Sequence, residues 1–387
     1  MINSSILKFD SDGKLLWGKD FNQGPFDYYP LTISRLEPDE SGNIILGGSF
    51  RSQINFGNDE RPFIIQPEIY DVVEQTGYTD YSEDIFVAKY DPDGDLIWVF
   101  SLGNKADERL LGLDINNQGN VMILGNFKDS IDLDTSEADY LVPSNGHSLA
   151  LHDTFVGIFS PSSELISGTS FCTGFQHGSY GFVADDKNGF LVAGRIGLKD
   201  LDQSLISKDN HADYGGSGGF LCDFNENNVL RWSSQWSSYH FCGVSTLDHD
   251  EQDFLYIAGD CLRNEGIITS DEPLEPVRYY PYSANLGKYT SSGVLIWESS
   301  WGNPDTVGID DIAVDNGSAI YLTGGLRLSQ DFDPGRGSVI KRARGSSDAY
   351  LAKYSSDGSL EWVRTWGSAD PLIVKFTNWK KVPWARL

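Results

Sequence analysis

The stretch Asp348-Ala-Tyr-Leu-Ala-Lys-Tyr-Ser-Ser-Asp-Gly-Ser-Leu-Glu-Trp-Val-Arg-Thr-Trp-Gly367 decides the fold of this chain. Aromatic and small residues alternate with others from Tyr350 to Tyr354, which is the period-two pattern of a β-strand. Ser355-Ser-Asp-Gly358 supplies a turn, and the alternation resumes from Leu360 to Trp366. The stretch therefore predicts a β-hairpin.

The same hairpin recurs along the chain. Its other copies lie at Ile6–Trp17, Ile85–Trp98, Thr154–Ser167, Phe220–Trp232 and Ala284–Trp297. Aligning the copies gives a tryptophan column with a serine in the third copy: Trp17, Trp98, Ser167, Trp232, Trp297 and Trp362. From Ser167 onward the members are 65 residues apart. A tryptophan that returns at a fixed interval is interpreted as a packing residue rather than a platform for a ligand.

A second kind of hairpin lies between these copies and includes a recurring glycine. These glycines are Gly47, Gly125, Gly194, Gly259 and Gly324. Each repeat of about 65 residues then holds four short antiparallel strands, with no helical periodicity. That pattern is typical of a β-propeller. We expect a single all-β propeller domain over residues 1–387, with six blades favoured and with seven blades or a truncated chain left open.

The segment 371–387 departs from the other repeats. Hairpins of the first kind number six and those of the second kind five, so Pro371–Leu387 would have to supply the missing partner. It contains four basic residues and no acidic one, unlike the rest of the chain. We expect this segment either to close the ring by pairing with the N-terminal hairpin or to mark a shifted end of a longer protein.

Several of these motifs resemble the bacterial β-propeller repeat family that is named for a seven-bladed propeller. The residues that carry the resemblance are the hairpin from Asp348, Ile312–Asp315, Tyr321–Gly324 and Asp331-Phe-Asp-Pro-Gly335. The likeness is strongest in the fifth repeat and extends over nearly the whole chain to about residue 370. It implies a propeller in a secreted or cell-surface bacterial protein, and it implies no reaction.

The charge balance restricts the partners. The chain has 29 basic and 56 acidic residues and a formal net charge of −27. Such a charge repels nucleic acids and anionic membrane surfaces. No apolar run reaches the roughly 18 residues that span a bilayer. No secretion signal is visible at the N-terminus. We expect a protein or glycan partner, with no nucleic acid and no insertion into a membrane.

The connection Phe50–Asp84 is longer than its counterparts in the other repeats, and binding often resides in such connections. It contains Tyr70, Tyr78 and Tyr81. The corresponding connection of the fourth repeat contains Arg278, Tyr279, Tyr280 and Tyr282. A tyrosine offers an apolar ring and a hydroxyl, which suits a sugar ring or a protein contact. These residues are candidate ligand contacts; alternatively, they cover blade edges.

Paired aspartates raise the question of calcium. Asp132 with Asp134, Asp200 with Asp202 and Asp331 with Asp333 follow the glycine column in three repeats. Spaced by two in an extended segment, both carboxylates of a pair point to one side. They either bind Ca²⁺ or cap a turn. The aspartates before Gly13 and Gly94 are interpreted as turn residues, because serine, threonine and asparagine replace them in other repeats.

The four cysteines lack the short spacing of a zinc or redox motif. If residues 250–253 form a tight turn, Cys242 and Cys261 face each other on adjacent strands. A disulfide between them is a candidate, although the register makes them a hydrogen-bonded pair. Cys172 and Cys222 are interpreted as buried thiols.

The sequence shows no catalytic motif. The six histidines lack metal-ligand spacing, and no serine lies in a nucleophile elbow. The first hypothesis is therefore a non-catalytic binding or scaffold propeller that contacts protein or glycan through the loops between blades. The alternative is a polysaccharide hydrolase or lyase that uses carboxylates in the central channel.

Overall fold

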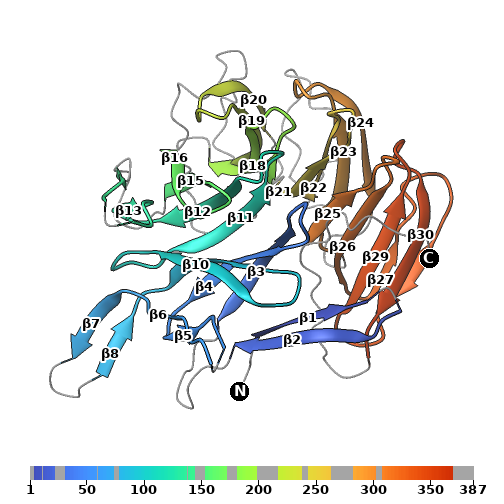
Figure 1. The fold of residues 1–387 in the computed structure, drawn as a ribbon. Helices are drawn as coiled ribbons and strands as arrows, with labels where there is room; N and C mark the ends of the chain where they lie inside the picture. Colours follow the sequence, from blue (N-terminus) through green and yellow to red (C-terminus); the bar gives the residue numbers. More distant parts are fainter. Residues whose placement is uncertain are drawn as a thin grey trace. The chain divides into compact units, whose positions relative to one another are not determined.

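The computed structural model describes residues 4–10, 12–21, 31–58, 60–73, 78–136, 138–143, 153–171, 181–197, 217–237, 243–262, 282–301 and 307–368. The chain forms two compact units, Met1–Gln176 and His177–Leu387. All regular structure in the described residues is β-strand, which confirms the all-β prediction (Figure 1).

The first unit contains two four-stranded antiparallel sheets, which we call blades 1 and 2. Blade 1 consists, in order across the sheet, of β3 (Thr32–Pro38), β4 (Ile44–Phe50), β9 (Asp84–Tyr90) and β10 (Leu96–Leu102). Blade 2 consists of β11 (Arg109–Ile115), β12 (Val121–Phe127), β15 (Asp153–Phe159) and β16 (Leu165–Phe171).

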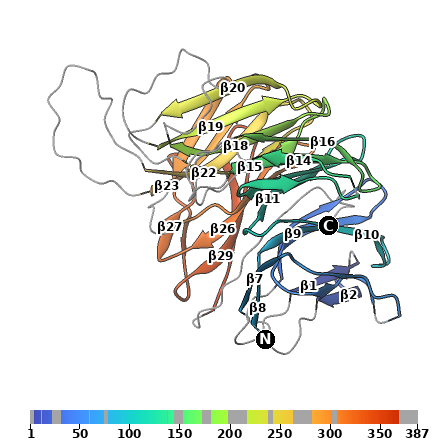
Figure 2. The ribbon, with the colours of Figure 1, turned by 90° about the vertical axis from the view of Figure 1, so that its left-hand side faces the viewer.

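The second unit contains three blades with the same order of strands. Blade 3 is β17 (Gly181–Ala184), β18 (Phe190–Gly197), β19 (Ser217–Phe224) and β20 (Leu230–Ser237), and Figure 2 shows β18, β19 and β20 side by side. Blade 4 is β21 (Gly243–His249), β22 (Leu255–Leu262), β23 (Tyr282–Tyr289) and β24 (Leu295–Trp301). Blade 5 is β25 (Asp311–Val314), β26 (Ile320–Leu326), β29 (Asp348–Tyr354) and β30 (Leu360–Trp366). The first strands β17, β21 and β25 are neighbours.

The described residues thus form five blades of the β-propeller kind rather than the six that the sequence favoured. The recurring hairpin is the outer half of each blade, and the hairpin with the glycine column is the inner half. The first hairpin, β1 (Ser4–Phe9) with β2 (Leu15–Phe21), has no further strand paired with it among those that the structure describes. Its expected partner, Pro371–Leu387, lies outside the described residues.

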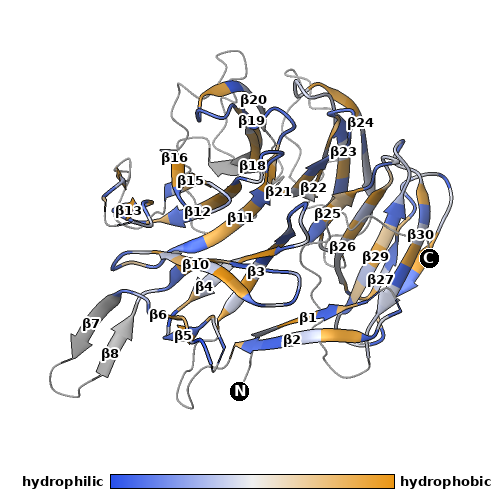
Figure 3. Cartoon of the chain, in the orientation of Figure 1, coloured by the Kyte–Doolittle hydropathy of each residue, from blue (hydrophilic) through white to orange (hydrophobic). Residues whose placement is uncertain are grey.

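Each blade is buried because its strands present apolar residues to both sides. In β9, Ile85 and Val87 pack in a cluster shared with blade 2, whereas Phe86 and Ala88 pack in a cluster shared with β1 and β2. Figure 3 shows apolar residues distributed along the strands of the blades. A strand buried on both faces explains the unbroken apolar run that begins at Ile85, since alternate side chains enter different cores.

The outer hairpins turn through a residue with a left-handed backbone. Gly94 and Gly358 have φ angles of 90° and 83°, and Ser163 and Asn228 occupy the same position with φ of 73° and 61°. In blade 1, Asp91 Oδ1 accepts hydrogen bonds from the backbone N–H groups of residues 93 and 95. The prediction that turn chemistry explains this column is confirmed.

The tryptophan column connects neighbouring blades. Trp17 Nε1 donates to the carbonyl oxygen of Pro92 at 3.0 Å, and Trp98 Nε1 donates to that of Pro161 at 3.0 Å. Trp297 Nε1 donates to that of Ser356 at 3.2 Å. Each indole therefore reaches the outer turn of the following blade, which confirms that these residues serve packing.

An additional hairpin is inserted between the second and third strands of blades 1, 2 and 5. These are β5 (Ile54–Asn55) with β6 (Ile64–Ile65), β13 (Ser130–Asp132) with β14 (Leu141–Pro143), and β27 (Ser329–Asp331) with β28 (Ile340–Arg342). Each hairpin buries the apolar residue at one shared position: Phe56, Leu133 and Phe332 are each 0% exposed, and Ile54 and Ile131 are fully buried as well. The inserted hairpins are therefore integral to their blades.

Candidate functional site

Blade 1 carries a second insertion that the other described connections lack. After β6, the chain forms the hairpin of β7 (Ile69–Val73) and β8 (Tyr78–Tyr81) before it enters β9. Three of the predicted ligand contacts, Tyr70, Tyr78 and Tyr81, belong to these two strands, and their side chains lie outside the description. Of the others, Arg278, Tyr279 and Tyr280 lie outside the described residues, and Tyr282 is the first residue of β23. Whether the two groups share a surface stays a prediction.

The base of this insertion is held by a buried carboxylate. Asp84 is 3% exposed and begins β9. Its Oδ1 accepts a hydrogen bond of 2.7 Å from the Ser82 hydroxyl, and its Oδ2 accepts one of 2.9 Å from the Glu68 N–H. Ser82 also donates to the Glu68 carbonyl oxygen. Burial raises the pKa of Asp84 to about 6. Glu68 and Ser82, which lie on either side of β7–β8, are thus both hydrogen-bonded to the Asp84 side chain.

A second buried carboxyl group lies in the same region. Glu108 is 0% exposed, its Oε2 accepts a hydrogen bond of 3.0 Å from the Asn104 N–H, and its Oε1 has no hydrogen-bond partner. Burial raises the pKa of Glu108 to about 8, and the charge of Asp84 contributes to that rise. A carboxyl group in this environment holds a proton at neutral pH, because its charged form would be desolvated and unpaired.

Charged side chains surround the two buried carboxyl groups. Arg51 forms ion pairs with Asp107 at 2.6 Å and with Glu83 at 3.3 Å, and Arg109 contacts Glu83 at 3.0 Å. The Glu108 N–H donates to the Glu83 carbonyl oxygen. These contacts join the connection between β4 and β9 of blade 1 to the start of blade 2. Both carboxyl groups with a raised pKa are enclosed, so this pair does not provide the accessible acid and base that a polysaccharide would require.

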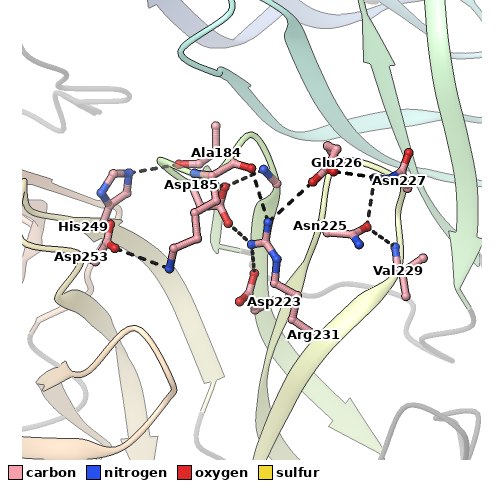
Figure 4. A network of polar contacts seen from close by, with 12 residues as sticks. Ala184, Asp185, Asp223, Asn225, Glu226, Asn227, Val229, Arg231, His249 and Asp253 are labelled. Carbon is pink, nitrogen blue, oxygen red and sulfur yellow. Dashed lines mark hydrogen bonds and ion pairs between the residues drawn. The ribbon is translucent and has the colours of Figure 1, made fainter.

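A network of polar contacts in the second unit lies where blades 3 and 4 meet (Figure 4). Arg231 of β20 forms ion pairs with Asp185, with Asp223 at 3.0 Å and with Glu226 at 3.9 Å. Burial raises the pKa of Asp223, although the charge of Arg231 opposes that rise. Lys187 forms an ion pair of 3.5 Å with Asp253 of blade 4.

This network replaces a pattern seen in other blades. The third strand of blades 1 and 4 carries a lysine that pairs with the first aspartate of the inner turn. Lys89 contacts Asp39 at 2.9 Å, and Lys288 contacts Asp250 at 3.8 Å. In blade 3 the lysine position holds Asp223, which is of opposite charge.

Arg231 supplies the cation that the lysine of the third strand supplies in blades 1 and 4. It lies on the outer strand, at the position that Glu361 occupies in blade 5, where Glu361 pairs with Lys353 at 2.9 Å. The Asp223–Arg231 pair is therefore the Lys353–Glu361 pair with its charges exchanged. The sequence signal for this site was the aspartate in a lysine column, which the repeat alignment contains but sequence reasoning did not use.

A shallow pocket lies beside this network. It encloses about 310 Å³, part of it open to solvent, and is lined by Asp185, Asp186, Lys187, Leu191, Asp223, His249, Asp253, Leu255 and Ser291. The two ring nitrogens of His249 contact the carbonyl oxygens of Ala184 at 3.0 Å and Asp250 at 3.2 Å. The ring thus bridges the turns of two blades. The pocket provides hydrogen-bonding groups of both charges around two leucines.

The paired aspartates of the inserted hairpins cap turns. Asp132 Oδ1 accepts hydrogen bonds from the N–H groups of Asp134 and Tyr140, each at 2.9 Å. Asp331 Oδ1 accepts from Asp333 at 3.1 Å and from Val339 at 2.7 Å. These contacts match the turn-capping alternative. The third pair, Asp200 and Asp202, lies outside the described residues.

Blade 1 shows that the cap needs no charge. Asn55 occupies the position of Asp132 and Asp331, and its Oδ1 accepts hydrogen bonds from Gly57 and Phe63 at 3.0 and 2.9 Å. An amide oxygen therefore performs the same task. The described residues contain no group of three or more His, Cys, Asp or Glu side chains placed to hold a metal ion. The calcium hypothesis stays a prediction.

The cysteine predictions have different outcomes. Cys222 is a buried, free thiol, as expected, and burial raises its pKa to about 12. Near the turn of β21 and β22 the register is one residue away from the expected one, because His249 pairs with Leu255. A bulge at Ser245 restores the expected register, so that Gly243 pairs with Asp260. Cys172 and Cys242 lie outside the described residues, and the disulfide of Cys242 with Cys261 stays a prediction.

Five four-stranded antiparallel blades define the class of this protein as β-propeller. No protein-family model and no curated protein matches the chain. No helix in the described part of the chain is long and apolar enough to cross a membrane.

Proposed function

We propose that this chain is a non-catalytic binding or scaffold propeller of a secreted or cell-surface bacterial protein. Its ligand is a protein or a glycan, which it contacts through the connections between strands. The observation that carries this proposal is the β7–β8 hairpin, an extra two-stranded ribbon in blade 1 that the described residues of the corresponding connections in blades 2 and 5 lack.

The attachment of this hairpin supports a role in recognition. A blade completes its core without β7 and β8, because β4 already pairs with β9 and the shorter β5–β6 hairpin already buries its own Phe56 against the blade. The hydrogen bonds from Ser82 and Glu68 to Asp84 hold both ends of the extra hairpin. A ribbon that the core does not need, on an ordered base, is suited to present its three tyrosines to a ligand.

The proposal is tested by removing the ribbon alone. Residues 69–81 are replaced with a short Gly-Ser linker, which retains Glu68, Ser82 and Asp84. The variant and the parent chain are compared on a glycan array and against candidate surface proteins. We expect an unchanged melting temperature and loss of binding. Binding that survives the deletion would overturn the assignment to this hairpin.

Removal of the tyrosine rings separates recognition from backbone effects. The variant Tyr70→Ala/Tyr78→Ala/Tyr81→Ala retains both strands and is expected to lose most of the affinity, since aromatic residues carry a large share of binding energy. A matched control is Tyr140→Ala, which removes an exposed tyrosine from β13–β14, the inserted hairpin of blade 2. Turnover of a polysaccharide by the parent chain would contradict the non-catalytic assignment.

We also propose that the β1–β2 hairpin is the outer half of a sixth blade, completed by Pro371–Leu387. Two exposed aromatic residues support this. Phe9 is 52% exposed, whereas its counterparts Tyr90 and Tyr354 are 0% exposed. Trp366 is 43% exposed, whereas its counterpart Trp301 is 5% exposed. Trp17 already packs on the turn of blade 1, as the tryptophan of a preceding blade would.

Deleting residues 371–387 tests the sixth blade. If these residues cover Phe9, the shortened chain should have a lower melting temperature, and the substitution Phe9→Ala should then cost little further stability. In the parent chain the same substitution should cost about 2–4 kcal/mol, as for a buried aromatic residue. An unchanged melting temperature after the deletion would contradict the closure.

A further inference from the structure

A concentration of positive charge lies on the inserted hairpin of blade 5. We call residues 327–344, which contain β27 and β28, the basic hairpin. Its basic residues are Arg327, Arg336, Lys341, Arg342 and Arg344. Its two acidic residues, Asp331 and Asp333, cap the turn. This segment is basic although the chain as a whole has a net charge of −27.

These cations are exposed and uncompensated. The four arginines are exposed and Lys341 is partly exposed. Among the described residues, none of the five side chains forms an ion pair; the ion pairs there involve other cations. The contacts that fix this hairpin are instead made by Phe332, Asp331 and the backbone. The positive charges therefore have no role in holding the described fold together.

Two aliphatic side chains are exposed among the arginines. Leu328 is 69% exposed and Ile340 is 64% exposed. Leu328 also has a φ of 55°, in the left-handed region that a leucine rarely adopts. Asp129, at the same position of blade 2, has a φ of 63°, and aspartate tolerates this backbone conformation better. An exposed leucine at a position that favours Asp, Asn or Gly is unfavourable for folding and suits a contact surface.

The corresponding hairpin of blade 2 has the opposite charge. Residues 128–143 contain one basic residue, Lys128, and five acidic residues: Asp129, Asp132, Asp134, Glu137 and Asp139. Both hairpins have the same aspartate cap, and each buries an apolar residue at the same position, Leu133 in blade 2 and Phe332 in blade 5. The structure of the hairpin thus does not depend on its charge. The positive charge of the hairpin in blade 5 is therefore not explained by folding.

We propose that the basic hairpin is a docking surface for an acidic peptide segment of a partner protein. Arginine forks bind carboxylates with two parallel hydrogen bonds, and Leu328 and Ile340 add an apolar contact between them. Arginine is enriched at protein interfaces. The described residues of the hairpin expose no aromatic ring on which a sugar would stack. A second copy of this chain is disfavoured as the occupant by the mutual repulsion of two strongly acidic molecules.

The inference is tested on the full chain with a fluorescent peptide rich in Glu and Asp, with leucines interspersed. Its binding is followed by anisotropy at low and moderate salt. The variant Arg336→Gln/Arg342→Gln/Arg344→Gln should bind the peptide at least about tenfold more weakly and with a smaller salt dependence. The control Lys14→Gln/Arg61→Gln/Lys105→Gln removes the same charge from exposed residues elsewhere and should bind like the parent chain.

A single substitution separates binding from stability. Leu328→Asn places a residue that tolerates a left-handed backbone at this position and should raise the melting temperature. It should also weaken peptide binding several-fold, because the apolar contact of the leucine is lost. A variant that simply unfolds would not show a raised melting temperature. The surface is independent of the tyrosine ribbon, so the chain without residues 69–81 should bind the acidic peptide normally even if the proposed function fails.

Three outcomes would overturn the proposal. The first is equal loss of peptide affinity in the control and the arginine variant, since net charge alone would then explain binding. The second is tighter binding of a sulfated dextran, with no measurable binding of the peptide, which would make the partner a polysaccharide. The third is concentration-dependent self-association in sedimentation that the arginine variant abolishes, which would make the occupant a second copy.

Discussion

The hydroxyl group of Tyr354 donates a hydrogen bond of 3.1 Å to the carbonyl oxygen of Phe332. Tyr90 makes the same contact in blade 1, where it donates to the carbonyl oxygen of Phe56 at 2.9 Å. Burial raises the pKa of Tyr354 well above its usual value, so the phenol remains a donor at any ordinary pH. One tyrosine of the third strand thus fixes the inserted hairpin onto its blade.

The first prediction concerns this contact. Tyr354→Phe should destabilise the chain by about 1–2 kcal/mol, because the buried carbonyl of Phe332 loses its side-chain donor. Denaturant unfolding measures the change. Tyr140→Phe removes a similar bond, to the Gly168 carbonyl oxygen, but from a tyrosine that is 42% exposed, and should cost less than about 0.5 kcal/mol. Equal effects at the two sites would show that burial of the bond is unimportant.

The second prediction is a pH dependence that arises from Glu108. Its pKa is raised from an ordinary value near 4.5 to about 8 in the folded chain, so the folded state binds more protons between these values. Its contribution to stability is therefore fully present below about pH 4.5 and is lost as the pH rises through 8. Glu108→Gln should raise the stability at pH 8.5 by a few kcal/mol, on the order of the shift at about 1.4 kcal/mol per pH unit.

The measurement for Glu108 is a series of unfolding curves between pH 5 and pH 9. The parent chain should lose stability over this range more steeply than the Gln variant. Asp84, with a pKa of about 6, contributes in the same direction over the lower part of the range. Arg109→Gln is the control, because it alters a half-exposed ion pair with Glu83 and should leave the steepness unchanged. A parallel pair of curves for parent and Glu108→Gln would refute the assignment.

The third prediction uses the exchanged charges of blade 3. Arg231→Glu leaves Asp185 and Asp223 without their cation and should destabilise the chain by about 2–4 kcal/mol. Adding Asp223→Lys recreates the arrangement of Lys353 and Glu361 and should recover most of that loss. A double-mutant cycle on unfolding free energies gives the coupling. Additive single effects would show that the two positions are independent.

The fourth prediction concerns the outer turns. Asn228→Gly and Ser163→Gly remove non-glycine side chains from a left-handed backbone, and each should change stability favourably or negligibly, by less than about 1 kcal/mol. Gly358→Ala should cost about 1 kcal/mol or more, because its φ is 83° and a Cβ would lie 3.0 Å from the Trp297 ring. Thermal unfolding distinguishes the signs. Destabilisation by both glycine variants would contradict the left-handed turn.

Regular spacing made the blades predictable from the sequence. The period-two alternation, the turn before each column tryptophan and the recurrence of the whole motif are local features, and the sheets follow them closely. The predicted register of β21 and β22 was wrong near the turn, because a bulge at Ser245 adds a residue that no local sequence pattern indicates. The sixth blade was also not evident in the structure, since among the described strands β1 and β2 pair only with each other.

The candidate sites were less predictable because they depend on contacts between repeats. Glu108 interacts with Asp84, and Arg231 interacts with Asp185. The members of each pair are well separated in the sequence, and no sequence pattern indicates that they meet in the fold. Asn55 was overlooked as a turn cap because the search required an aspartate, although an amide oxygen accepts the same bonds. The predicted tyrosine contacts depended on the length of a connection, and the structure places three of them on one ribbon.

The inserted hairpins of blades 1, 2 and 5 occupy the same place in their blades and share one type of turn cap. Each has a side-chain oxygen at the cap followed by a buried apolar residue, as at Asn55 and Phe56, whereas its exposed positions carry different charges in different blades. Transplanting the residues around β13 and β14 onto blade 5 should therefore reverse its surface charge without disturbing Tyr354 or the core beneath it. A propeller built in this way can acquire a new partner by altering one short ribbon, and its blades need not evolve at all.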